Sequence, residues 1–156
     1  NYLFKDAEKN RVYVKEKAEP GAKTAVTEYR TLCSKGPLSL VECHLLTGRT
    51  HQIRAQMAHA GWPLLGDGKY GNERFNKNYD ENGQALYSYR LVFRFPTDAG
   101  ILNYLKGKEF QVESVEFTEK YFGAGLKELA KQDERVKYVS KLSSSEKSTN
   151  LILRRI

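Results

Sequence analysis

The segment from Leu46 to Gly71 constrains this chain more than any other, because it combines a glycine turn, a polar helix start and two glycine-rich breaks. A strand-like run ends at Leu46, and Gly48 then permits a sharp turn. Apolar residues recur at helical spacing over 50–60, Thr50 can cap the start, and Gly61 can close the end in left-handed geometry. The pattern predicts a helix over 50–60.

Runs rich in β-branched and aromatic residues predict strands over most of the chain before about residue 120. Both faces of Leu38–Leu46 are apolar, which is typical of a central strand in a covered sheet. A short link containing Gly36 and Pro37 precedes it, so this strand is predicted to form a hairpin with the one before. The predicted strands are Arg11–Lys15, Ala25–Cys33, Leu38–Leu46, Leu86–Phe95 and, more weakly, Phe110–Phe117.

The alternating aromatic residues of Leu86–Phe95 favour a core face, although the same face could stack bases. The polar segment 72–84 is predicted to be a loop. Near the end, 127–139 is typical of a charged helix, and 141–150 has the composition of a disordered linker.

Composition bounds the class of protein. A chain of 156 residues is long enough for one domain with a real core, and its formal net charge of +7 suits a polyanionic partner or serves solubility alone. Cys33 and Cys43 lie in apolar segments without metal-type spacing, which indicates buried thiols in a reducing compartment, the cytoplasm. No apolar run is long enough to span a membrane, and we expect no membrane partner.

The strongest candidate site is the turn and helix start from Gly48 to Arg54. A helix N-terminus offers free N–H groups and a partial positive charge, and Arg49 and Arg54 add planar donors that bind phosphate or carboxylate. The alternative is an ordinary capped surface helix with solvated arginines.

Other polar residues have simpler explanations. His44, His51 and His59 lack the spacing of a metal site, so no bound metal is expected. Asp67 lies between two glycines, where an aspartate side chain more often binds backbone N–H groups of a tight turn than takes part in catalysis.

The run LTGRTHQIR over 46–54, followed by GWPLLGD over 61–67 and KYG over 69–71, resembles the third sequence motif of the RluA-type pseudouridine synthases. Segments 3–6, 21–25 and 27–30 resemble the family's strands upstream of this motif, and ALYSYRLVFRFP over 85–96 resembles its downstream strand. The resemblance extends over about residues 1–118.

The resemblance implies an isomerase that converts uridine to pseudouridine in structured RNA, ribosomal RNA or transfer RNA, without metal or organic cofactor. It also implies an α+β fold with a mixed, mainly antiparallel sheet and flanking helices. The family's pocket arginine matches Arg54, which pairs with a nucleophilic aspartate, and Leu91 is the match for a residue packing on the pocket. The residues expected to contact RNA are Arg49, Thr50, His51, Gln52, Lys69 and Tyr70.

The family's nucleophile lies in a His-Arg-Leu-Asp segment, and these 156 residues contain none. We therefore expect residues 1–122 to form the C-terminal part of the catalytic domain and 123–156 a C-terminal helix and partly disordered tail. The fragment alone should be inactive. Its partner would be the missing N-terminal half of the domain, and without it an exposed sheet edge could drive self-association.

Two other functions remain open. A non-catalytic RNA-binding module would explain the charge and the missing nucleophile. A metal-dependent nuclease or phosphatase would use His51 and Asp67 and would require a divalent metal.

Overall fold

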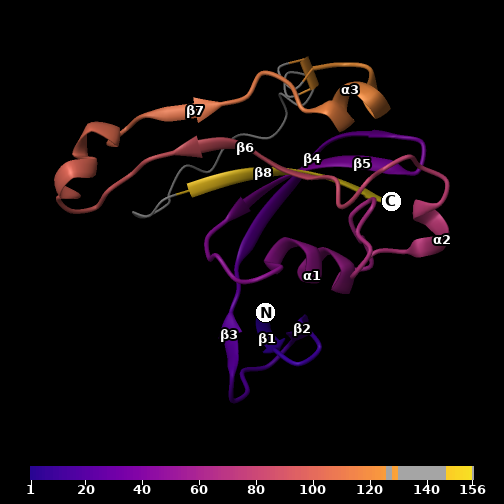
Figure 1. Ribbon diagram of the computed structural model, residues 1–156, viewed down its shortest axis with the longest axis horizontal. Helices are drawn as coiled ribbons and strands as arrows, with labels where there is room; N and C mark the ends of the chain where they lie inside the picture. The colour runs from indigo at the N-terminus through magenta and orange to yellow at the C-terminus, as the bar shows by residue number, and fades with distance from the viewer. Residues whose placement is uncertain (126–127, 130–146, 156) are drawn as a thin grey trace.

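The computed structural model describes residues 1–125, 128–129 and 147–155 and contains two antiparallel sheets with short helices (Figure 1). The smaller sheet has the order β2-β1-β3, from strands β1 (Tyr2–Asp6), β2 (Arg11–Lys15) and β3 (Ala22–Thr24). The expected α+β class with antiparallel strands is confirmed, and the predicted strand over 11–15 matches β2.

The larger sheet has the order β4-β5-β8-β6-β7, and every neighbouring pair is antiparallel. Strands β4 (Thr27–Lys35) and β5 (Leu38–Leu45) form the predicted hairpin, and β5 is buried over its first six residues. The remaining strands are β6 (Leu86–Val92), β7 (Glu109–Gln111) and β8 (Lys147–Arg155). Strand β5 is thus an interior strand, as its two apolar faces predict.

The principal helix, α1 (Gln52–His59), lies between the two sheets (Figure 1). It ends as the glycine predicts: Gly61 has a φ of 86°, and Gly61 and Trp62 donate backbone hydrogen bonds to Ala58 and Met57. This pair of bonds is the Schellman arrangement. The other helices are α2 (Glu73–Asn76), the 3₁₀ helix η1 (Gly100–Leu105) and α3 (Glu116–Phe122).

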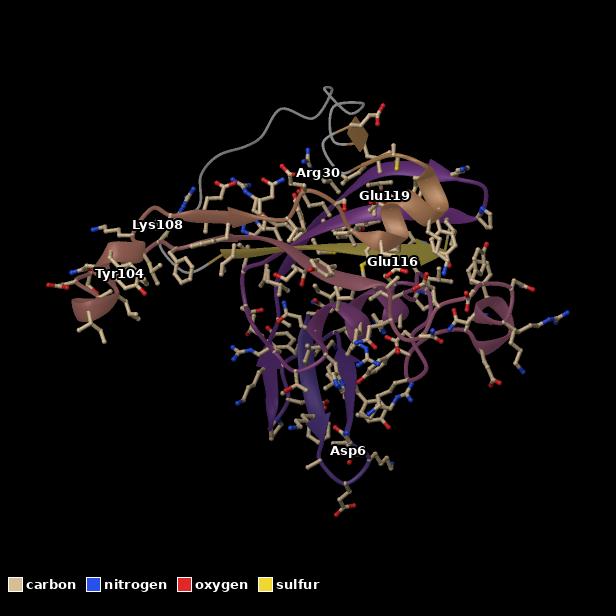
Figure 2. The ribbon with its side chains drawn as sticks, turned by 45° about the horizontal axis from the view of Figure 1, so that its top comes forward. Asp6, Arg30, Tyr104, Lys108, Glu116 and Glu119 are labelled. Atoms are coloured by element: carbon tan, nitrogen blue, oxygen red, sulfur yellow. The ribbon has the colours of Figure 1, made fainter. Side chains whose placement is uncertain are left out.

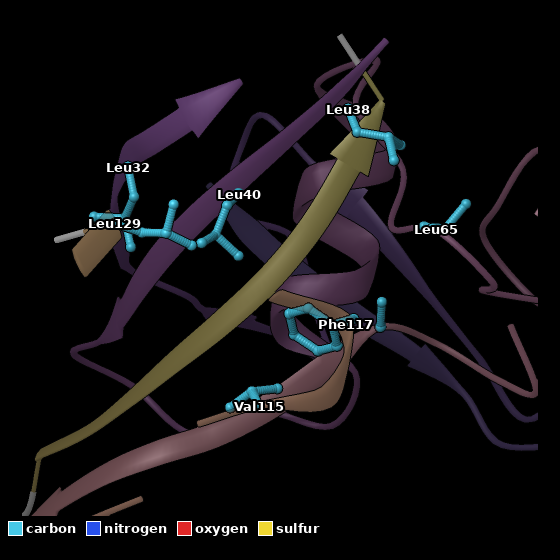
Figure 3. Packing of buried hydrophobic residues seen from close by; sticks show 8 residues of the cluster. Leu32, Leu38, Leu40, Leu65, Val115, Phe117 and Leu129 are labelled. Carbon is cyan, nitrogen blue, oxygen red and sulfur yellow. The ribbon is translucent and has the colours of Figure 1, made fainter. Parts of the chain in front are cut away.

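Three clusters of buried side chains hold these elements together. The largest joins β4 and β5 to α3, with Leu40 and Phe117 among its members (Figure 3). A second cluster packs Ile53 and Met57 of α1 on Val41 and Cys43 of β5, and a third packs Ala55 of α1 on the smaller sheet. Helix α1 is therefore fixed on both sides by apolar contacts.

Several predictions for the second half of the chain were wrong. Strand β6 ends at Val92, and its aromatic face is core only in part: Tyr89 packs against the largest cluster, but Tyr87 is 45% exposed and Leu91 36%. The predicted loop over 72–84 contains α2, and α3 replaces the end of the predicted strand over 110–117. Strands β6 and β7, with η1 at their tip, form an arm that extends away from the clusters, with Tyr104 and Lys108 near its end (Figure 2).

The C-terminal segment also differs from expectation. Lys147–Arg155 forms β8 between β5 and β6, although 141–150 has linker composition. Backbone pairing with two neighbouring strands can order a segment of weak local preference. The predicted helix over 127–139 lies outside the described residues, apart from Glu128 and Leu129, which are helical. Among the described residues, no helix has the length and apolar character needed to cross a bilayer.

Candidate functional site

The helix at the centre of the site begins later than predicted. The residue that caps α1 is His51, not Thr50, and it has left-handed backbone geometry with a φ of 51°. No side chain of the capping residue closes the helix. Instead, the side-chain carbonyl of Gln52 accepts a hydrogen bond of 3.0 Å from the backbone N–H of Arg49. The turn from Gly48 to His51 is therefore held by the side chain of Gln52, the first residue of the helix.

Gln52 is a structural residue of this turn. It is only 3% exposed. Its amide nitrogen donates to the carbonyl of Val26 and the hydroxyl of Thr27, and its carbonyl also accepts from the hydroxyl of Thr47. These bonds leave no polar group of Gln52 facing outward, so we assign it a positioning role in place of the expected RNA contact.

A buried ion pair joins Arg54 to Asp67. The guanidinium donates from Nε to Oδ2 and from Nη2 to Oδ1, both at 2.8 Å. The Asp67 side chain is 0% exposed and that of Arg54 15%. Such a two-point ion pair fixes the plane of the guanidinium as well as its position.

Asp67 also performs the turn role expected from its glycine neighbours. Its Oδ1 accepts the backbone N–H groups of Lys69 and Tyr70, each at 2.9 Å. Burial raises the pKa of the Asp67 carboxyl, but the hydrogen bonds from Arg54 and from these backbone groups outweigh burial and bring it below its ordinary value. The carboxylate is therefore ionised, and its hydrogen bond raises the pKa of Arg54.

Tyr70 connects the helix to the smaller sheet. Its hydroxyl accepts the backbone N–H of Val12 at 2.8 Å and lies 3.1 Å from Nδ1 of His51. The guanidinium carbons of Arg11 and Arg54 lie 4.9 and 5.3 Å from the centre of its ring. Two cations thus stack on one tyrosine, an arrangement that favours both.

His51 is held in its neutral form at this position. Burial lowers its pKa most, the positive charges of Arg54, Lys69 and Lys5 lower it further, and Asp67 opposes them. A neutral ring can accept the hydroxyl hydrogen of Tyr70 at Nδ1, because that hydroxyl already accepts from Val12. Nε2 then carries the ring hydrogen.

Three of the residues predicted to contact RNA lie on the outer side of the group formed by His51, Arg54, Asp67 and Tyr70. They are Arg49, Thr50 and Lys69. Arg49 and Thr50 are exposed, and Nε of Arg49 donates to the carbonyl of Thr24 at 3.1 Å. The ammonium of Lys69 donates to the carbonyl of Asn10 at 2.7 Å. Each cation is anchored by one neutral carbonyl, so its charge is not neutralised there.

Leu91, the match for a residue that packs on the pocket, is 36% exposed in this chain, and its role stays a prediction. It belongs to the exposed part of β6, where its strand neighbour is Phe110 of β7. Leu86, at the start of the same strand, packs instead against the cluster that contains Ile53 and Met57 of α1. The register shift between Ser88 and Arg90 separates the two leucines, and no sequence pattern marks it.

The geometry gives no support to a metallohydrolase. Both carboxylate oxygens of Asp67 accept hydrogen bonds from Arg54 and the turn. Within the described ranges, no group of three or more His, Cys, Asp or Glu residues could hold a metal ion.

The antiparallel α+β fold is consistent with part of a pseudouridine synthase domain. Residues 1–59 match the family model of RNA pseudouridylate synthases. The chain belongs to the RluA-type pseudouridine synthase family.

Curated relatives carry the same family name. The chain is 50% identical over 74 residues to an uncharacterised RNA pseudouridine synthase, YlyB, of Bacillus subtilis, covering 47% of this chain and 23% of the relative. It is 44% identical over 84 residues to the ribosomal large subunit pseudouridine synthase D of Neisseria meningitidis, covering 49% and 22%. A Mycoplasma pneumoniae RNA pseudouridine synthase is 35% identical over 106 residues, covering 68% and 32%.

The matched part of the chain spans less than a third of each of these relatives. No solved structure matches it significantly.

Proposed function

We propose that this chain supplies the arginine-bearing part of a pseudouridine synthase active site that converts uridine to pseudouridine in RNA. The observation that carries the proposal is the orientation of Arg54. Asp67 takes the Nε and one Nη2 hydrogen of the guanidinium. Within the described residues Nη1 has no hydrogen-bond partner, so it is left as a donor edge of a guanidinium that has five N–H groups.

That free edge suits a second carboxylate. A nucleophilic aspartate supplied by residues outside this chain would bind at Nη1 of Arg54 and stay ionised beside the fixed cation. Asp67 acts as a positioning residue, because it holds the guanidinium through two bonds and is itself held by the turn. The aspartate attacks the base or the sugar, and the N-glycosidic bond breaks. Uracil turns and rejoins the ribose through carbon 5, the bond to the aspartate breaks, and the hydrogen of carbon 5 leaves as a proton.

RNA reaches the site over the cationic side of α1 in this proposal. The proposed contacts are Arg49, Thr50, His51, Lys69 and Tyr70, with Arg11 beside them. The uridine must leave its stack to enter. Ribosomal RNA is the proposed substrate, since one relative is named for the large ribosomal subunit, and the cytoplasm is the proposed compartment.

The partner proposed for the chain is the rest of the catalytic domain, which carries the nucleophile. Alone, the chain should not turn over uridine. We also propose that it self-associates without that partner, because large apolar side chains such as Ile101 and Tyr104 are 92% and 66% exposed on the arm.

The test is to join this chain to the remainder of its domain and to follow tritium release from RNA labelled at carbon 5 of uridine. Forming the new bond at carbon 5 releases that hydrogen. Release by the joined protein and none by the chain alone is expected. RNA binding without release by the joined protein would favour a non-catalytic RNA-binding module instead.

A further inference from the structure

A cavity of about 200 Å³ lies between the smaller sheet and the turn that precedes α1. The sheet side contributes Lys5 and Lys23, and the turn contributes Gly48, Arg49 and Thr50. No acidic residue lines it. Neither Arg54 nor Asp67 lines the cavity, which shares Arg49 and Thr50 with the turn described above.

The strand register explains why both lysines face the cavity. Lys23 is opposite Leu3, and Lys5 is opposite Val12. Residues directly opposite in antiparallel strands share a face, and so do Leu3 and Lys5, which are two positions apart on one strand. The face that carries buried Leu3 and Val12 therefore also carries both cations at its rim.

The three cations of this cavity differ from the cations that carboxylates neutralise elsewhere in the protein. Lys9, Lys15, Arg30 and Arg90 each form an ion pair with a carboxylate. Within the part of the chain that the structure describes, Lys5, Lys23 and Arg49 form none. Like charges gathered around one cavity repel each other, and a bound anion relieves that repulsion.

Two further features admit an anion to this cavity. At Gly48 no atom would lie within 4 Å of an added side chain, so the backbone of the turn is open to a ligand. The exposed hydroxyl of Thr50 adds a neutral donor beside Arg49. The positive potential extends beyond the cavity, because Lys5 contributes to lowering the pKa of His51.

We propose that this cavity binds a backbone phosphate of the RNA, held by Lys5, Lys23 and Arg49, close to the nucleotide that enters the Arg54 site. The inference rests on the proposed function, because it takes RNA as the ligand. A phosphodiester carries one negative charge and acceptor oxygens on several sides, which suits three cations converging from two elements. The phosphate would position the strand and read no sequence.

The test compares RNA binding by the 156-residue chain with that of the double variant Lys5→Gln/Lys23→Gln. The probe is a fluorescently labelled RNA hairpin with a uridine-containing loop, followed by anisotropy over a salt series. The matched control is Lys17→Gln/Lys35→Gln, which removes the same charge outside the cavity. Because all four lysines are exposed, folding should persist, and circular dichroism verifies it.

The double variant should bind RNA about tenfold more weakly than the control, with a salt slope lower by about 0.7, as expected for one lost phosphate contact on a single strand. Equal affinities and slopes for the two double variants would overturn the cavity assignment. The assignment would also be overturned if neither the double variants nor the unchanged chain bound RNA. The proposed function is tested by a different measurement, and it fails if the joined domain releases no tritium.

Discussion

The guanidinium of Arg54 and the carboxylate of Asp67 meet edge to edge, with two hydrogen bonds of 2.8 Å, although 13 residues separate them in the sequence. Asp67 is 1% exposed as a residue and also closes its own turn. The pair therefore links the start of α1 to the loop that follows it. In the proposed site it leaves the Nη1 edge of Arg54 for the nucleophile.

Replacing Asp67 with Asn should destabilise the protein by about 3 kcal/mol, because Arg54 would keep a buried charge without its counter-ion. Chemical denaturation of the chain measures this. Asp80→Asn is the matched control: the Asp80 side chain is 94% exposed, so its change should stay within about 0.5 kcal/mol. Equal effects of the two substitutions would show that the Arg54–Asp67 pair adds no stability.

The same pair predicts an acid-side dependence of stability. The pKa of Asp67 is lower in the folded protein than its ordinary value. Its contribution should therefore be complete above the unfolded pKa, near 3.9, and be lost as the pH falls through the folded value. Denaturation midpoints between about pH 5 and pH 2 measure it. The Asp67→Asn variant should lose this part of the slope, and an unchanged acid-side slope would contradict the prediction.

The lowered pKa of His51 predicts a second dependence of stability on pH, nearer neutrality. Its pKa is lowered on folding, chiefly by burial and then by Arg54. Below about pH 6.5 the unfolded chain binds a proton that the folded His51 does not, so stability should fall as the pH drops towards the folded pKa. His51→Asn should remove this slope, since asparagine tolerates the φ of 51° and does not titrate. The prediction would be refuted if the stability of the unchanged protein depended on pH no more steeply than that of the His51→Asn variant.

Gln52→Ala should destabilise the chain by about 3 kcal/mol, because four hydrogen bonds are lost and several partners remain buried. Gln84→Ala, at an exposed position, should change stability by less than about 0.5 kcal/mol. Thermal denaturation of both variants gives the comparison. RNA affinity lost by Gln52→Ala with no loss of stability would instead support a direct RNA contact.

The two glycines after Asp67 should respond differently to alanine. A side chain at Gly71 would overlap the backbone carbonyl of Asp67, whereas nothing lies within 4 Å at Gly68. Gly71→Ala should therefore cost more than about 2 kcal/mol, and Gly68→Ala should be tolerated. Denaturant midpoints measure both, and equal tolerance would mean that the turn is not as tight as described.

Local chemistry made part of this structure predictable from sequence. The β4–β5 hairpin, the closing of α1 at Gly61 and the turn at Asp67 depend on neighbouring residues, and all three are confirmed. The pairing of Arg54 with Asp67 depends on how the chain returns after α1. No local pattern gives that path, and the motif resemblance suggested only a different partner for Arg54.

Long-range pairing accounts for the failures. Strand β8 forms because backbone groups of β5 and β6 are available on both sides, although its first residues, 147–150, belong to the segment with linker composition. The alternation in β6 predicts a core face, but although Tyr89 packs against a buried cluster, Tyr87 and Leu91 on the same face are exposed. Burial of a strand face depends on what packs on it, which alternation alone does not reveal.

The most direct test of the central claim is tritium release from uridine-labelled ribosomal RNA by the joined catalytic domain carrying Arg54→Lys. Lysine keeps the charge, but it cannot bind Asp67 through two bonds and present a second donor edge in a fixed plane. We predict no measurable release, with the unchanged protein active and the variant folded by circular dichroism. Near-normal release by the variant would contradict the role assigned to Arg54.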